Sequence, residues 1–245
     1  MEVCLLAGKI MLKSGAETYR IEDTMNRIAQ TYTVREVHSY VTNTGIFLSV
    51  DSLTGEQSLT KFLRIHERQI NLNKIADVNE ISRKITLGQL TIEEAHIALQ
   101  NIEKAPLLYP FRLQLLAAAL ASGSFTLIFG GAFIDFLPSV IAGGVGFFLY
   151  SKFNRRSEVK FFAEVLASFT IGAIAYLFFF LGLEIHIDKV IIGSVMPLVP
   201  GVLITNAVRD LMAGDLLSGL ARGAEAFFTA FAIGAGIAII LALLM

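Results

Sequence analysis

Apolar and polar positions follow two different patterns along this chain, and the change falls near residue 112. From Val3 to Ile28 apolar residues recur at intervals of three and four, which predicts a helix. Gly15 lies inside this stretch. Because glycine costs about 1 kcal/mol relative to alanine in a helix, we expect Gly15 to weaken or bend it.

Short alternating runs come next and predict a small antiparallel sheet, with turn residues between the strands. The predicted strands cover 34–41, 46–50 and 59–66. Two helices follow, one over 74–87 and one that begins at Thr91 and ends before Pro106. Thr91 and Glu94 have the spacing of a capping box. Residues 1–110 are therefore predicted to form an α+β domain: a helix, three strands and two helices.

Beyond residue 112 the pattern becomes almost continuously apolar, and a membrane helix needs about 20 such residues. Five candidate spans are predicted, over 113–134, 138–150, 161–183, 190–204 and 223–245. The fourth is short and contains Pro197 and Pro200-Gly201. Residues 111–245 are therefore predicted to form an α-helical integral membrane bundle whose fourth span is broken at Pro-Gly.

Charge orients these spans, because cytoplasmic loops are enriched in Lys and Arg. With the N-terminal domain inside, seven juxtamembrane positive charges lie on the inner side: Arg112, Lys152, Arg155, Arg156, Lys160, Arg209 and Arg222. Only Lys189 lies outside. The first residues continue into a charged amphipathic helix rather than a cleavable apolar signal. We therefore expect a multi-pass protein of the plasma (inner) membrane, with the N-terminal domain cytoplasmic and Met245 outside.

Composition narrows the classes of function. A mean hydropathy of +0.64 with 54% hydrophobic residues is too apolar for an ordinary globular protein. A net charge of −1 gives no reason to propose nucleic acid as a partner. The single cysteine, Cys4, allows no intrachain disulfide, and we interpret it as a packing residue. We expect no catalytic residue, no metal site and no cofactor.

The N-terminal domain carries several polar side chains of interest: Glu17, Glu22, Asp23, His38 and His66. They lack the spacing of metal ligands, and no nucleophile motif or phosphate loop accompanies them. A solvated polar face is the main interpretation. A hydrolytic or ligand-sensing role is the alternative, and it would need a Ser or Thr near one of the two histidines.

The segment that begins at the fourth span carries the strongest functional signal. Pro200 has no N–H and clashes one turn back, so the helix should break near Val199. Such breaks free backbone groups and often form binding sites in transporters. The candidate substrate-binding residues are Pro200, Gly201, Thr205, Asn206, Arg209 and Asp210. Arg209 would pair with a substrate carboxylate, together with Asn206, and Asp210 with an ammonium group or a proton.

A plainer alternative is an amphipathic connector whose charges face water. On a continuing helix Asn206, Arg209 and Asp210 share one face under either interpretation. Candidates for proton coupling are Asp215, Glu225 and Glu164, and the two glutamates could instead be solvated or paired with nearby arginines. Glycine patches in the apolar half are interpreted as sites of close helix packing.

Several stretches together resemble the N-terminal part of the threonine/serine exporter family. They are Ser14–Thr18 within Gly8–Arg20, Thr44–Ile46, Phe129–Gly131, Pro200-Gly201, Thr205–Asp210, Gly214-Asp215, Ser218-Gly219 and Ala221-Arg222. The match is spread over nearly the whole chain, and the series from Pro-Gly to Ala-Arg is specific.

The resemblance implies a cytoplasmic domain, a five-span membrane unit and secondary transport driven by the proton motive force. Family substrates are threonine and serine, with succinate export assigned to a split two-subunit branch. The chain looks like the larger subunit of that split form, with a smaller membrane subunit as partner in an oligomer. The choice between Thr/Ser and a dicarboxylate stays open, since both carry carboxylates.

Two other classes of function remain as alternatives. A non-transporting membrane sensor or scaffold would use the spans only as an anchor. A membrane-anchored hydrolase would need a nucleophile and a base at membrane depth, where the apolar half offers only His186, near its outer edge.

Overall fold

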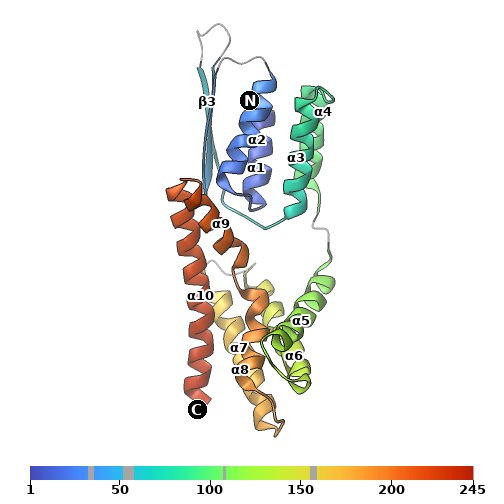
Figure 1. The fold of residues 1–245 in the computed structure, drawn as a ribbon, viewed down its shortest axis with the longest axis vertical. Helices are drawn as coiled ribbons and strands as arrows, with labels where there is room; N and C mark the ends of the chain where they lie inside the picture. Colours follow the sequence, from blue (N-terminus) through green and yellow to red (C-terminus); the bar gives the residue numbers. More distant parts are fainter. Residues whose placement is uncertain (33–35, 52–57, 107–108, 155–158, 245) are drawn as a thin grey trace. The chain divides into compact units, whose positions relative to one another are not determined.

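The computed structural model describes residues 1–244 except 33–35, 52–57, 107–108 and 155–158. The described chain divides into two compact units (Figure 1). The first unit holds Met1–Pro106 and also Val202–Gly223, and the second holds Leu107–Gly201 and Ala224–Met245. Residues 202–223, which the sequence pattern groups with the membrane half, thus pack with the N-terminal residues.

The first unit consists of four helices and a three-stranded sheet, joined by a later helix pair. In chain order its N-terminal elements are α1 (Glu2–Lys13), α2 (Thr18–Thr31), β1 (Val37–Thr42), β2 (Gly45–Asp51), β3 (Ser58–Arg64), α3 (Leu72–Thr86) and α4 (Ile92–Lys104). Residues 202–223 add α9 (Gly201–Met212) and the start of α10 (Leu216–Leu244). The predicted order of helix, three strands and two helices is confirmed, apart from the division of the first helix.

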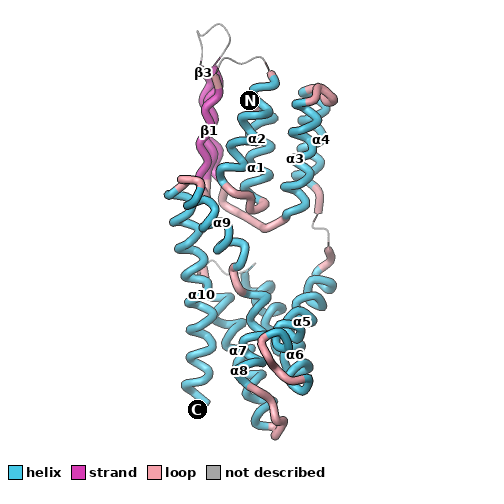
Figure 2. The backbone as a smooth tube through the Cα atoms, in the orientation of Figure 1, coloured by secondary structure: helices cyan, strands magenta, loops and turns pink. Residues whose placement is uncertain are grey.

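The sheet, whose strands are magenta in Figure 2, has the order β1-β2-β3 with antiparallel pairing throughout, as predicted. Val41 pairs with Ile46 across β1 and β2, and both side chains are fully buried against the helices. Because β3 ends at Arg64, His66 lies beyond the strand that was predicted to contain it.

The single helix predicted from Val3 to Ile28 is wrong, because the chain forms two helices there. Gly15 adopts φ +84°, a left-handed conformation that ends α1. The apolar periodicity resumes in α2 on the same core, where Ile21, Met25 and Ile28 are fully buried. The apolar spacing therefore predicted the buried faces of the two helices correctly but did not predict the break at Gly15.

The last two N-terminal helices begin at side-chain caps. Asn71 accepts a hydrogen bond from the Lys74 backbone at the start of α3. Thr91 and Glu94 form the predicted capping box of α4, with both reciprocal bonds present. Cys4 is buried in the core that these helices share with α1, as a packing residue would be.

The second unit is a helical bundle whose helices differ in length from the predicted spans, some being longer and some shorter. Its helices are α5 (Phe111–Ile128), α6 (Phe133–Asn154), α7 (Phe162–Phe180), α8 (Ile187–Val195), the 3₁₀ turn η1 (Met196–Leu198) and the main part of α10. Four helices are long and apolar enough to cross a membrane: α5, α6, α7 and α10. If α8–η1 and α9, which are separated by a break, are taken together as one span, the described residues contain five candidate spans.

Several predicted span boundaries are corrected. α5 ends at Ile128 rather than 134, because Gly130 at φ +83° turns the chain. α6 begins at Phe133 and contains Pro138 near its start instead of beginning there. α10 begins at Leu216, seven residues before the predicted 223. In the region of the fourth predicted span the helix is interrupted at Val199 and Pro200, as predicted, and the helix after the break ends at Met212.

Candidate functional site

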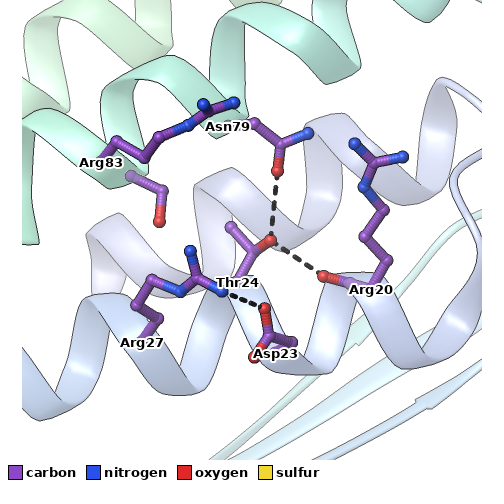
Figure 3. Close-up of a pocket in the computed structure, with 7 residues that line it drawn as sticks. Arg20, Asp23, Thr24, Arg27, Asn79 and Arg83 are labelled. Atoms are coloured by element: carbon purple, nitrogen blue, oxygen red, sulfur yellow. Dashed lines mark hydrogen bonds and ion pairs between the residues drawn. The ribbon is translucent and has the colours of Figure 1, made fainter.

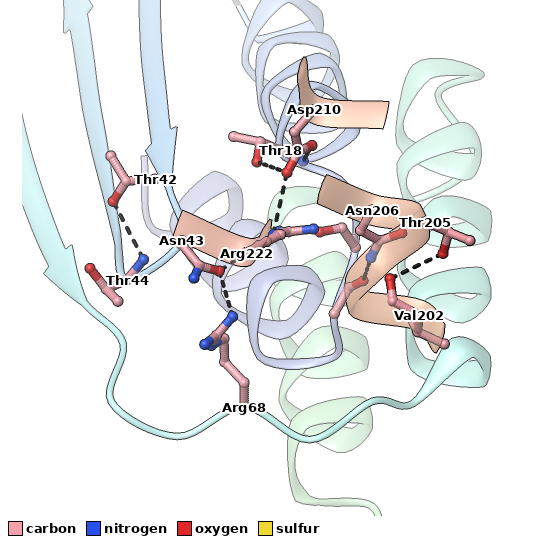
Figure 4. A network of polar contacts seen from close by, with 12 residues as sticks. Thr18, Thr42, Asn43, Thr44, Arg68, Val202, Thr205, Asn206, Asp210 and Arg222 are labelled. Carbon is pink, nitrogen blue, oxygen red and sulfur yellow. Dashed lines mark hydrogen bonds and ion pairs between the residues drawn. The ribbon is translucent and has the colours of Figure 1, made fainter. Parts of the chain in front are cut away.

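The break between α1 and α2 meets α9 and the first turns of α10, all within the first unit (Figure 4). Gly214 at φ +90° makes the turn that folds α10 back toward α9. The two helices approach closely, because a Cβ atom on Gly219 would lie 2.9 Å from the Leu211 nitrogen. This helix pair carries most of the polar residues that the sequence analysis singled out.

Side chains of α9 and α10 satisfy the backbone groups that the α1–α2 break leaves open. Asn206 Nδ2 donates to the Gly15 carbonyl at 2.8 Å, and Arg222 Nη2 donates to the Ala16 carbonyl at 2.8 Å. The Thr18 N–H donates to Asp210 Oδ1 at 3.0 Å. Helix ends have no intrahelical partners for these groups, so such bonds hold the break in place.

Asp210 thus acts as an N-terminal cap for α2 from a distant part of the sequence. The residue in the capping position, Glu17, makes no side-chain cap bond of its own. Asp210 receives both the backbone N–H and the hydroxyl of Thr18, the latter at 3.1 Å. A carboxylate at a helix N-terminus is also favoured by the helix dipole.

The centre of the network is a buried ion pair between Asp210 and Arg222. Arg222 Nε lies 3.3 Å from Asp210 Oδ2, and the two side chains are 2% and 0% exposed. Asn43 Oδ1 accepts from Arg222 Nε at 3.3 Å and also from Arg68. Buried charges are tolerated only when paired and fully hydrogen-bonded, which is the case for Asp210.

Arg209 lies at the edge of the network and pairs with Glu17. The Arg209 side chain is 61% exposed, whereas that of Glu17 is only 7% exposed. Burial opposes ionisation of Glu17, but hydrogen bonds from its own backbone N–H and from Arg209 outweigh it and lower the pKa of the carboxyl group. The interpretation of Glu17 as part of a solvated polar face is therefore wrong.

Two half-buried acids, Glu22 and Asp215, lie beside the network of Asp210 and Arg222. We call these four residues together with Glu17, Asn206 and Arg209 the α9 cluster. Burial raises the pKa of Glu22, and the charges of Asp215 and Asp210 raise it further, although the Val41 N–H donates to Glu22 at 2.7 Å. Burial, followed by the charge of Asp210, raises the pKa of Asp215 against the opposing effect of Arg222. Both carboxyl groups therefore hold a proton more readily than free side chains do.

The structure brings some of the predicted site residues together and leaves others apart. Asn206, Arg209, Asp210 and Asp215 meet around the α1–α2 break. Thr205 is exposed, and its hydroxyl donates to the Val202 carbonyl at 3.1 Å. The remaining candidates, Pro200, Gly201, Glu164 and Glu225, belong to the second unit, and their roles stay predictions.

Sequence reasoning missed the pairing of the 15–18 segment with α9, and with it the part played by Thr18, Glu22 and Asn43. The sequence did contain a signal that Thr18 and Glu22 are neighbours. Glu22 is four residues after Thr18, so the two lie on the same face of a helix. No comparable signal links either residue to Asp210, which is 192 positions beyond Thr18.

Comparisons with known proteins find a family and several relatives. The model of the ThrE family, described as putative threonine/serine exporter, matches residues 2–244. The chain is 24% identical to a probable threonine/serine exporter of Mycobacterium tuberculosis, over 98% of this chain and 45% of that protein. It is 24% identical to a threonine/serine exporter of Corynebacterium glutamicum, over 97% of this chain and 50% of that protein.

A shorter relative is matched over most of its length. The chain is 26% identical to the probable succinate transporter subunit YjjP of Escherichia coli, over 96% of this chain and 91% of that protein. The chain thus spans about half the length of the two exporters and nearly all of the subunit. No solved structure matches the chain significantly.

Proposed function

This chain belongs to the putative threonine/serine exporter family, and we propose that it is a subunit of a proton-coupled exporter of small carboxylate-bearing metabolites. The family consists of membrane exporters rather than enzymes. The names of the relatives support either threonine and serine or a succinate-type dicarboxylate as substrate. The subunit status of YjjP supports a second, smaller membrane subunit as partner in an oligomer.

The pairing of exposed Arg209 with buried Glu17 is the observation that carries this proposal. The Arg209 side chain is 61% exposed and therefore reaches solvent, whereas Arg222 is buried with Asp210. A substrate carboxylate has the same chemistry as the Glu17 side chain, so it competes for the same guanidinium. Substrate binding would then exchange an internal carboxylate for an external one.

Asn206 and Asp210 have a positioning role in this proposal. The Asn206 amide and both Asp210 oxygens are engaged by residues 15–18, which fixes α9 beside Glu17. The sequence-based assignment of Asp210 to an ammonium group or a proton is less consistent with these contacts than a structural role. Asn206 already donates one of its two amide N–H groups to the Gly15 carbonyl.

Proton coupling is assigned to Asp215 together with Glu22. Burial first, and then the charges of nearby carboxylates, raise the pKa of both acids and favour their protonated forms. Both acids lie in the same cluster as Arg209, so their charge acts on the affinity of Arg209 for an anion. Glu164 and Glu225 remain second candidates for this step in the second unit.

We place the protein in the plasma (inner) membrane with its N-terminal domain in the cytoplasm and its C-terminus outside. The excess of Lys and Arg in the predicted inner loops supports this orientation. The apolar outer surfaces of the long helices support contact with lipid; examples are Phe180, Phe227 and Phe231, each more than half exposed.

Efflux of labelled threonine, serine and succinate from cells tests the proposal, with the chain expressed alone or with the candidate small subunit. Arg209→Gln is expected to lower efflux at least about tenfold, because one charge-assisted contact with the substrate is lost. Arg64→Gln, which removes an exposed arginine of β3, is the matched control and should retain efflux.

The protein level in the membrane and the protection of Cys4 from a maleimide dye confirm that each variant is folded. Unchanged efflux in Arg209→Gln would remove this residue from the mechanism. Efflux that tolerates Arg209→Gln, Glu22→Gln and Asp215→Asn alike would favour the sensor or scaffold alternative.

A further inference from the structure

A separate pocket of about 270 Å³ lies on the first unit between α2 and α3. Arg20, Asp23 and Arg27 line it from α2, and Asn79, Ser82 and Arg83 from α3 (Figure 3). We call it the arginine pocket. It contains none of the α9 residues of the candidate transport site, so its chemistry needs its own explanation.

The charges around the arginine pocket do not balance. Asp23 pairs with Arg27 at 2.6 Å, which accounts for one of the three arginines. Arg20 reaches Glu17 only at 3.8 Å, and Glu17 is already paired with Arg209. Within the described part of the chain, no ion pair is found for Arg83. An excess of about two positive charges therefore borders one small cavity.

The wall of the same pocket contains two buried polar atoms that lack partners. Ser82 is 2% exposed, and among the described residues its hydroxyl has no hydrogen-bond partner. The Asn79 amide nitrogen is also buried without a partner, although Asn79 Oδ1 accepts a bond from Thr24 at 3.5 Å. Unpaired buried groups are costly and rare in native proteins, so two at one wall point to a missing acceptor.

We propose that the arginine pocket binds a small dianion whose two charges reside on carboxylates or on a phosphate group. Guanidinium groups bind both of these anions through paired N–H donors. The Ser82 hydroxyl and the Asn79 amide supply the neutral donors that such oxygens accept from. The cavity volume lies near the lower end of small-molecule sites, which suits a compact metabolite rather than a nucleotide.

Arg20 connects the arginine pocket with the proposed transport site around Arg209. It lies between the arginine pocket and Glu17, the carboxylate that pairs with Arg209. An anion that engages Arg20 removes a cation from Glu17 and leaves Arg209 as its main partner. The bound dianion would therefore act as an effector on the first unit, independently of which substrate is exported.

Calorimetric titration of the purified full-length chain with inorganic phosphate and with succinate tests the site. Acetate and chloride at equal ionic strength serve as monoanion controls. We expect saturable binding of at least one dianion, and the stronger of the two identifies its source. Binding should persist in Arg209→Gln, which separates this site from the proposed transport site.

Two variants locate the binding. Arg83→Gln is expected to weaken the dianion about tenfold, whereas Lys84→Gln, next to it and paired with Glu80 at 2.7 Å, should not. Ser82→Ala should weaken binding by about threefold without lowering the unfolding temperature of the ligand-free chain, because it removes an unpaired hydroxyl. Absence of binding by both dianions, or equal losses in Arg83→Gln and Lys84→Gln, would overturn the proposal.

Discussion

The two units of this chain have interiors of different composition. The first unit is filled with large aliphatic side chains, such as Met11, Leu12, Ile28 and Leu99, all completely buried. The largest fully buried side chain of the second unit is Ile171, and the buried residues of α5, α6 and α7 are mainly alanine, glycine and serine. The same polypeptide thus uses two kinds of packing.

Backbone proximity replaces side-chain volume in the second unit. A Cβ atom on Gly193 in α8 would lie 2.6 Å from the Thr126 nitrogen in α5, so these helices touch directly. Hydroxyl groups link the same helices to α6, where Thr126 donates to Ser139 at 2.7 Å. Small residues and interhelical hydroxyl bonds are typical of helices that associate in lipid.

The difference follows from the solvent that each unit displaces. In water, burial of aliphatic surface stabilises a fold by about 25 cal/mol per Å², which favours large core side chains. In lipid that gain between helices disappears, and close van der Waals contact takes its place. Most buried polar residues of the first unit lie around the α1–α2 break, whereas those of the second unit are spread along its helix contacts.

The largest expected change in stability comes from breaking the buried ion pair between Asp210 and Arg222 in the first unit. Arg222→Met leaves Asp210 buried without its cation, so the first unit should lose about 3–5 kcal/mol of stability. Thermal unfolding followed by reaction of Cys4 with a maleimide dye reports this loss, because Cys4 is the only cysteine and lies in the first core. An unchanged transition would show that the pair is dispensable.

A smaller effect is expected from the close helix contact of the second unit. Gly193→Ala places a methyl group against the Thr126 backbone and should cost about 1–3 kcal/mol. Gly234→Ala is the matched control, since nothing lies within 4 Å of its Cβ position. Accessibility of a cysteine in a Cys4→Ser, Ala142→Cys variant reports on this unit. Equal responses of the two glycine variants would contradict the packing argument.

The smallest expected change in stability comes from the half-buried acid Glu22 and depends on pH. Its folded pKa lies above the ordinary 4.5, so the folded state binds more protons and loses stability as pH rises through this window. Glu22→Gln does not titrate, and should be more stable than the parent at pH 8 by less than about 1 kcal/mol. Thermal unfolding followed by circular dichroism should find no such gain below about pH 4.5. A gain of equal size at both pH values would argue against the pKa shift.

Local sequence signals predicted local features well. The capping box at Thr91 and the helix break at Val199 were confirmed because each depends on neighbouring residues. The alternating pattern gave the sheet, since its buried face includes Val41, Ile46 and Leu48. The break at Gly15 was missed, because apolar spacing continued across it and a bend was expected to suffice.

The candidate site needed the tertiary structure. The sequence placed Asn206, Arg209 and Asp210 on one helical face but could not say what that face meets. The partners of these residues are backbone and side-chain groups of residues 15–18, which form no recognisable spacing with α9. Glu17 was for the same reason assigned to a solvated face.

The sequence by itself determined the small sheet and the long apolar helices, because hydropathy and periodicity are sums over neighbouring residues. Only the tertiary structure decided that Asp210 and Arg222 are buried together while Arg209 remains exposed. The cap of α2 by Asp210 and the pairing of Arg209 with Glu17 join residues 192 positions apart, and no local sequence pattern predicts such contacts.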